Sequence, residues 1–139
     1  MISIEGKIVT SRGEFHQRVE IDEASGLIVR VGDITGSADY VFKDELIFPG
    51  FIDLHVHARE DTSHTHDYKE DFVTAGAAAV NGGVVAFADM PNNPIPPVDD
   101  ASYEAKSKLA EKSSVPILLY AAVGAGTKPL SKKVPYKAF

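Results

Sequence analysis

The chain has 139 residues and a formal net charge of -6 at pH 7, and it contains no cysteine. A negative charge argues against a nucleic acid or an anionic membrane as the main partner, so we expect neither. Without cysteine a metal site would have to use His, Asp, Glu or a modified Lys. There is no signal-peptide pattern and no apolar run near the ~20 residues of a membrane span, so we expect a soluble, cytoplasmic protein.

The first part of the chain, up to about Lys43, is predicted to form a small antiparallel β unit. Runs of β-prone residues alternate with turn residues at a spacing typical of short strands. The strands are expected at 2–9, 19–21 and 27–31, with turns at 11–13 and 23–26.

The pattern changes near residues 48–50, where Pro49-Gly50 interrupts a dense apolar run. From here strands and helices alternate, which predicts parallel βαβ units with right-handed crossovers, in a barrel or a doubly wound sheet. The first helix is expected to begin at Asp67, with Glu70 closing a capping box. The strands are predicted at 84–90, 115–123 and 136–139, and the helices at 67–83 and 101–112, the second of them capped by Asp99 or Asp100.

The most informative stretch runs from Pro49 to Arg59 and carries histidines at positions 55 and 57. Side chains alternate between the two faces of a strand, so Asp53, His55 and His57 should share one face while the apolar residues at 52, 54, 56 and 58 pack on helices. Two imidazoles at this spacing can bind one zinc ion. The alternative is a pair of hydrogen-bonded core histidines, which the cost of polar groups on a buried parallel strand disfavours.

The run PGFIDLHVHARE, residues 49–60, resembles the first barrel strand of the amidohydrolase superfamily, with its His-x-His pair. An arginine two residues after the second histidine resembles the dihydroorotase family in particular. By this resemblance Arg59 binds the substrate carboxylate, which a guanidinium can do with two parallel hydrogen bonds. Without the resemblance, Arg59 would be interpreted as a surface residue. Glu60-Asp61 stands where that family usually has Glu-Pro.

Two later segments are similar to the same family. Residues 67–83 resemble its first barrel helix, and residues 89–94, DMPNNP, resemble its Met-Pro-Asn signature after the second barrel strand. The resemblance implies that Asn92 helps Arg59 to hold the substrate. Without it, residues 91–97 would be a proline-rich turn.

Two further positions, Lys137 and Asp53, complete the candidate site. Lys137 resembles the lysine of the fourth barrel strand that many family members carboxylate to bridge two metal ions; the alternative is a terminal lysine without such a role. Asp53 is expected to support the site from deeper in the barrel, or to orient a histidine. His64 and His66 form a second His-x-His in a polar loop, and we interpret them as flexible surface residues.

The resemblance implies an α/β fold, namely the N-terminal part of a metal-dependent (β/α)8 TIM barrel preceded by a small β-sandwich unit. Residues 1–48 would be the N-terminal β-strand unit of the composite β-sandwich, and residues 49–139 the first half of the barrel. A complete barrel needs about 250 residues. We therefore expect a fragment with four of eight barrel strands.

The activity implied is metal-dependent hydrolysis of a cyclic amide, the interconversion of N-carbamoyl-L-aspartate and L-dihydroorotate in pyrimidine biosynthesis. One or two zinc ions would be held by His55, His57 and a carboxylated Lys137. The family takes its other histidines and its catalytic aspartate from later strands, so we expect no catalytic residue within this chain and no activity from it alone. Unpaired strand edges predict a homo-oligomer, and a transcarbamoylase is a candidate partner.

Two alternatives remain open. A hydantoinase or allantoinase shares the fold and the metal site, and Arg59 and Asn92 weigh against it. A non-catalytic dihydroorotase-like scaffold protein belongs to a different class. Such homologues often lose metal ligands, so the presence of His55 and His57 weighs against this alternative.

Overall fold

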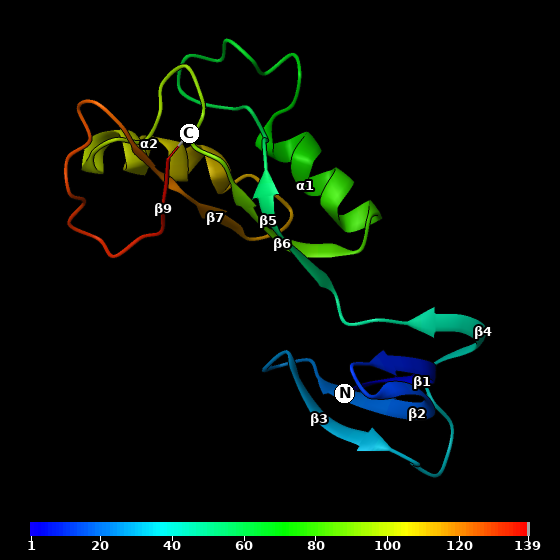
Figure 1. Cartoon of the computed structure of the whole chain (residues 1–139). Helices are drawn as coiled ribbons and strands as arrows, with labels where there is room; N and C mark the ends of the chain where they lie inside the picture. Colours follow the sequence, from blue (N-terminus) through cyan, green and yellow to red (C-terminus); the bar gives the residue numbers. More distant parts are fainter. Residues whose placement is uncertain (139) are drawn as a thin grey trace. The chain divides into compact units, whose positions relative to one another are not determined.

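A computed structural model describes residues 1–138 of the chain (Figure 1). The chain divides into two compact units, Met1–Pro49 and Gly50–Phe139. The second unit therefore starts one residue after the boundary expected from the sequence. Among the described residues, no helix has the length and apolar character needed to cross a membrane.

The first unit is a four-stranded sheet with the order β3-β2-β1-β4. β1 pairs with β2 and β2 with β3 in antiparallel orientation, whereas β1 and β4 are parallel. The strands are β1 (Ile2–Thr10), β2 (Gly13–Asp22), β3 (Leu27–Gly32) and β4 (Tyr40–Ile47). The fourth strand was not among those expected from the sequence, and the charged run Lys43-Asp44-Glu45 lies at its centre.

Gly6 allows β4 to approach β1. A Cβ atom at this position would lie 2.8 Å from the carbonyl oxygen of Phe42 and 2.8 Å from Cδ1 of Ile47. The pairing of the two strands shifts register between Glu5 and Lys7, on either side of this glycine. The missing side chain thus makes room for a parallel fourth strand.

In the second unit parallel strands alternate with helices, which bears out the mixed α/β class expected from the sequence. Strands β5, β6 and β7 form one parallel sheet and β8 and β9 another, with Tyr120 alone separating β7 from β8 in sequence. The elements are β5 (Phe51–Val56), α1 (Phe72–Asn81), β6 (Val84–Asp89), α2 (Asp100–Ala110), β7 (Ile117–Leu119), β8 (Ala121–Val123) and β9 (Tyr136–Ala138). The expected last strand included Phe139, which lies outside the described residues.

Each helix begins directly after an aspartate that caps it. The Asp71 carboxylate accepts a hydrogen bond from the Thr74 N–H at 2.7 Å, and Asp99 accepts one from the Ser102 N–H at 2.9 Å. In both helices the hydroxyl of the third residue accepts from the backbone N–H of the capping aspartate, which closes a capping box.

The expectation that the first helix begins at Asp67 was wrong. Residues 64–69 form turns, in which the Asp67 N–H donates to the His64 carbonyl at 3.5 Å and the Lys69 N–H to the His66 carbonyl at 2.9 Å. The helix is instead capped by Asp71, so α1 starts at Phe72.

The core of the second unit is formed by apolar side chains from α1, β6, β7 and the adjoining loops. Phe72 and Phe87 are its large aromatic members, with exposed fractions of 0% and 2%. Its buried residues are Ala58, Phe72, Ala75, Phe87, Val115 and Leu119. Tyr103, Leu109 and Ala110 of α2 are partly buried against this cluster, so both helices pack on the core.

Strand β5 departs from the strict alternation expected from the sequence. Val56 and Ala58 pack in the core as expected, but Ile52 and Leu54 are exposed and line an apolar hollow with residues of β6 and β7. The pairing of β5 with β6 shifts register between Asp53 and Val56, and this irregularity breaks the two-residue repeat. The expectation that residues 52 and 54 pack on helices was therefore wrong.

Candidate metal and substrate site

Two loops that follow neighbouring strands carry half of the six candidate site residues. The loop after β5 contains His57 and Arg59, and the loop after β6 contains Asn92 (Figure 1). Because β5 and β6 are parallel, both loops leave the same edge of the sheet. A backbone hydrogen bond from the Met90 N–H to the Val56 carbonyl, 2.8 Å long, joins them at their start.

The two histidines lie side by side at the carboxyl end of β5. The ring centroids of His55 and His57 are 5.2 Å apart and the ring planes meet at 64°. His55 is exposed and His57 is half-buried. This separation is compatible with one ring nitrogen of each histidine reaching a common ion at the zinc–nitrogen distance of about 2.1 Å.

Asn92 fixes the orientation of the second imidazole. Its Oδ1 lies 2.8 Å from Nδ1 of His57. An amide oxygen can only accept, so with this orientation Nδ1 carries the proton and Nε2 keeps the free lone pair. A neutral imidazole held in this way at one nitrogen is the form in which histidine usually binds a metal through the other. The NH2 group of Asn92 stays available as a donor.

Asp53 contacts the backbone of the His-x-His segment. Its carboxylate accepts a hydrogen bond from the His55 N–H at 2.9 Å and bonds to no imidazole nitrogen among the described residues. Asp53 and His57 also line an open hollow of about 180 Å³ beside α1. The aspartate therefore supports the strand that carries the histidines, and orients neither ring directly.

Arg59 has a left-handed backbone conformation, with a φ of 65°. Such a conformation costs a residue other than glycine about 1–3 kcal/mol and must be maintained by its surroundings. The neighbouring Ala58 N–H donates to the Asp89 carboxylate at 2.9 Å, which helps to hold the segment. Arg59 is half-buried, and its guanidinium makes no hydrogen bond or ion pair with any other described residue, Asn92 included, so it can bind an anion.

Lys137 lies on β9, paired with Ala122 of β8. Its Nζ is 5.4 Å from the centroid of the Tyr120 ring, a cation–π contact. The Tyr120 hydroxyl donates to the Leu54 carbonyl at 3.3 Å, so this tyrosine contacts both the lysine and the strand that carries the histidines. No direct bond joins Lys137 to His57 in the described part of the chain.

A buried ion pair that the sequence did not reveal links α2 to the two loops. Asp89 and Lys106 have exposed side-chain fractions of 0% and 3%, and the carboxylate oxygen lies 2.6 Å from the ammonium nitrogen. Lys106 also donates to Oδ1 of Asn93, which follows Asn92. Burial raises the pKa of the Asp89 carboxyl, and the adjacent ammonium opposes this rise. The aspartate that ends the apolar run VVAFAD is the one signal that could have pointed to this pair.

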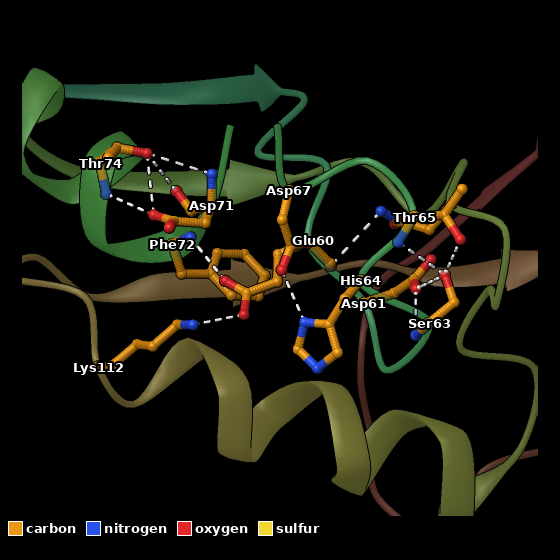
Figure 2. Close-up of polar contacts among 11 residues, drawn as sticks. Glu60, Asp61, Ser63, His64, Thr65, Asp67, Asp71, Phe72, Thr74 and Lys112 are labelled. Atoms are coloured by element: carbon orange, nitrogen blue, oxygen red, sulfur yellow. Dashed lines mark hydrogen bonds and ion pairs between the residues drawn. The ribbon is translucent and has the colours of Figure 1, made fainter. Parts of the chain in front are cut away.

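Glu60 and Asp61 hold the loop after β5 in place (Figure 2). Glu60 is fully buried; it accepts a hydrogen bond from the Phe72 N–H at 2.8 Å and forms an ion pair with Lys112. Asp61 accepts a hydrogen bond from the Ile95 N–H at 3.0 Å, which ties the two loops together. Burial acts to raise the pKa of Asp61, but its hydrogen bonds outweigh this and hold the pKa below its usual value.

The residues present fit part of a zinc site. His55 and His57 supply two nitrogen ligands, and the contact with Asn92 keeps His57 in the ligating form. Zinc sites usually have three or four protein ligands. Among the described residues no third histidine or acidic group lies close enough to complete the set. A full site around this pair needs ligands from elsewhere.

Residues 46–125 match the amidohydrolase family, which is more than half of the chain. The chain therefore belongs to the amidohydrolase family, as the His-x-His segment predicted.

The relatives it resembles act on different substrates. The chain is 40% identical over 100 residues to a dihydroorotase of Methanothermobacter thermautotrophicus, covering 70% of this chain and 22% of that protein. It is 34% identical over 119 residues to an allantoinase of Bacillus licheniformis, covering 83% and 26%. An L-hydantoinase (dihydropyrimidinase) structure from Arthrobacter aurescens has a TM-score of 0.75 and 19% identity over 91% of this chain and 28% of that chain, a likeness of fold. The chain spans about a quarter of the length of the curated relatives it matches.

Proposed function

We propose that this chain supplies the His-x-His metal ligands and part of the substrate site of a zinc-dependent cyclic amide hydrolase of the dihydroorotase type. The observation that carries the proposal is the arrangement of His57. Its ring lies 5.2 Å from that of His55, and Asn92 holds its Nδ1 at 2.8 Å. A surface histidine has no need of a half-buried amide that fixes its tautomer, whereas a metal ligand does.

The chain's own residues would have distinct tasks in this reaction. A bound zinc ion acts as a Lewis acid and lowers the pKa of water toward ~7. His55 and His57 would hold the ion, and Asp53 would fix the backbone between them. Lys137, once carboxylated, would offer an anionic oxygen in place of its ammonium group. Carboxylation would also end its cation–π contact with Tyr120.

Arg59 favours an acidic substrate. Its guanidinium has no internal partner in the described part of the chain, and a carboxylate is the group it binds best. N-carbamoyl-L-aspartate and L-dihydroorotate both carry a carboxylate, and hydantoin and allantoin carry none. The Asn92 NH2 group would donate to the same substrate while its oxygen holds His57. The second candidate is an allantoinase or hydantoinase, which the 34% identity to an allantoinase supports.

The remaining ligands and the catalytic base would come from residues outside these 139. This part of the proposal is supported by the two-ligand site and by the fraction of the relatives' length that is covered. By itself the chain would bind metal and have no turnover. We further propose that β5–β9 with α1 and α2 correspond to half of a (β/α)8 barrel, and residues 1–48 to part of a β-sandwich. A partner for the open strands, a second copy among them, would then be needed.

Zinc binding by the 139-residue chain tests the metal part. Equilibrium dialysis should show that the His55→Ala/His57→Ala double variant binds one zinc ion fewer than the parent. Asn92→Ala should lower the affinity for the same zinc ion by about 10- to 100-fold. His16→Ala is the matched control, because His16 is an exposed histidine on β2. If the double variant binds as much zinc as the parent, the metal role is wrong and a scaffold protein becomes the better interpretation.

Ligand binding tests the substrate class separately. Ligand-observed NMR on the zinc-loaded chain should show dihydroorotate binding in preference to hydantoin and allantoin. Arg59→Met should abolish that preference, whereas Arg12→Met, at an exposed turn, should not. Equal binding of all three compounds, unaffected by the change at Arg59, would favour the allantoinase or hydantoinase alternative.

A further inference from the structure

A second set of metal-binding side chains lies in the loop between β5 and α1 (Figure 2). Glu60, His64 and Asp67 each present one ligand atom, and these atoms all lie within 4.8 Å of one another. We propose that this Glu-His-Asp group binds a divalent transition-metal ion such as Zn²⁺, at a site separate from the His55–His57 pair. An ion bound there would cross-link residues of the same loop that carries Arg59.

The donor set has the chemistry for such an ion. One imidazole and two carboxylates are ligands that zinc accepts, and three protein ligands leave a position for water. Two carboxylates close together repel each other unless a cation lies between them. The set contains no thiolate, so a softer ion such as Cu⁺ is not favoured.

Two buried polar atoms of this loop have no hydrogen-bond partner, and for the carboxylate oxygen a cation is a suitable one. Oδ1 of Asp67 is buried and has no hydrogen-bond partner, although Oδ2 of the same carboxylate lies 2.6 Å from Nδ1 of His64. Nδ1 of His66 is likewise buried without a partner. Buried carboxylate oxygens are nearly always paired, and a metal ion is one of the groups that can pair them.

The ligands are also held in place before any ion binds. The hydrogen bond from the Phe72 N–H fixes the fully buried Glu60 carboxylate. The His64 N–H donates to the Asp61 carbonyl at 3.1 Å, and the His64 backbone has a left-handed φ of 55°. Figure 2 shows His64 and Asp67 joined on one side of Glu60. The side chain of His64 is 58% exposed, as the sequence interpretation of a surface residue predicted, but its Nδ1 is bonded to Asp67.

Lys112 competes for this site. Its ammonium pairs with Oε1 of Glu60, and the hydrogen bond to that carboxylate raises the pKa of the lysine. The lysine side chain is 40% exposed, so it can move into solvent when an ion takes its place. Removing it should strengthen metal binding. In a loop that is merely ion-paired, the same change would leave zinc affinity unaltered.

The test is zinc titration of the full 139-residue chain in the His55→Ala/His57→Ala background, with a chromophoric chelator as competitor. This background lacks the first site, so the result does not depend on the proposed function. His64→Gly removes the imidazole at a φ that glycine accepts, and His16→Ala is the control for an exposed histidine. Circular dichroism of each variant checks that the helices persist.

We expect the double variant to bind one zinc ion, and His64→Gly to lower the affinity for that ion by more than about tenfold. Lys112→Met should tighten it about two- to fivefold, the range of an exposed ion pair. Zinc-edge X-ray absorption should show one imidazole and otherwise oxygen ligands. The proposal is overturned if no equivalent is retained, or if His64→Gly and His16→Ala have the same zinc affinity.

Discussion

Replacing Lys106 with methionine would leave the buried Asp89 carboxylate without its ammonium partner. The two side chains have exposed fractions of 3% and 0%, so water cannot take the place of the lysine. Methionine is similar in length and removes the charge, together with the cation–π contact of Lys106 with the Phe72 ring. The change also removes the hydrogen bond that Lys106 donates to Asn93, so part of the measured loss belongs to that bond.

The expected loss follows from the cost of an unpaired buried charge. Removing one partner of a buried ion pair costs about 3–5 kcal/mol. Asp89 can avoid this cost by taking up a proton, and the cost of that protonation is the upper limit of the electrostatic loss in unfolding free energy. Holding the carboxyl neutral costs about 1.36 kcal/mol for each pH unit above its ordinary pKa of 3.8. This limit is about 4 kcal/mol at pH 7 and roughly 1.6 kcal/mol at pH 5.

The sign of the pH effect is fixed by the direction of the pKa change. Burial already raises the pKa of Asp89 in the folded chain, and loss of Lys106 raises it further. The folded variant then binds a proton more tightly than the unfolded chain, so its stability relative to the parent recovers as the pH falls. We expect a loss of about 3–4 kcal/mol at pH 7 and of about 1–1.6 kcal/mol at pH 5.

Urea unfolding at the two pH values, followed by circular dichroism at 222 nm, measures this loss in the unit that contains α1 and α2. Lys108→Met is the matched control on the same helix, at an exposed position, and should change stability by less than about 0.5 kcal/mol. Adding Asp89→Asn to the Lys106→Met variant should restore part of the stability at pH 7. A loss below about 1 kcal/mol that is the same at both pH values would refute the reasoning.

Three other changes have defined outcomes. Gly76→Ala would place a Cβ 2.9 Å from the Ser114 backbone nitrogen and should cost about 1–3 kcal/mol in urea unfolding, whereas Gly124→Ala, with nothing within 4 Å, should be near neutral. Asp99→Ala removes the cap of α2 and should cost about 1 kcal/mol, with loss of helical signal on heating. The lowered pKa of Asp61 contributes stability that is present above pH 3.8 and is lost as the pH falls through the lower folded-state value. Asp61→Asn should therefore lower the urea midpoint at pH 7, and parent and variant should converge in acid.

Much of the fold could be predicted because local patterns and tertiary structure agree. The presence of the first three strands, of both helices and of the parallel strands follows from hydrophobic runs and turn residues. The bounds were less accurate, since β2 is longer than the expected strand at 19–21 and the single strand expected at 115–123 is divided into β7 and β8. β4 could not be predicted from its charged centre, because its pairing depends on the space left by Gly6. The irregular β5 was missed for a similar reason, since a register shift between paired strands leaves no mark in the sequence of one of them.

Members of the candidate site could be predicted only where the residue type itself suggests a ligand or a hydrogen-bonding role. His55, His57 and Asn92 were singled out, and the structure brings His57 and Asn92 into contact. Lys106 could not be found, because a lysine on an otherwise polar helix looks exposed until the helix is docked. The involvement of Glu60 was hidden too, since its partner Lys112 lies 52 residues away.

In the three-stranded sheet of the second unit, β6 pairs with β5 and β7 pairs with β6, so each added strand pairs with the one before it in the chain. The partners Ile52 and Ala86 are 34 residues apart, and Phe87 and Ile117 are 30 apart. When each strand is synthesised, the strand that it pairs with has already been made. The sheet can therefore form strand by strand from one edge as the polypeptide leaves the ribosome. We expect backbone amides of β6 to be protected from hydrogen exchange in nascent chains as soon as β7 has emerged. The order of synthesis would then also be the order of assembly.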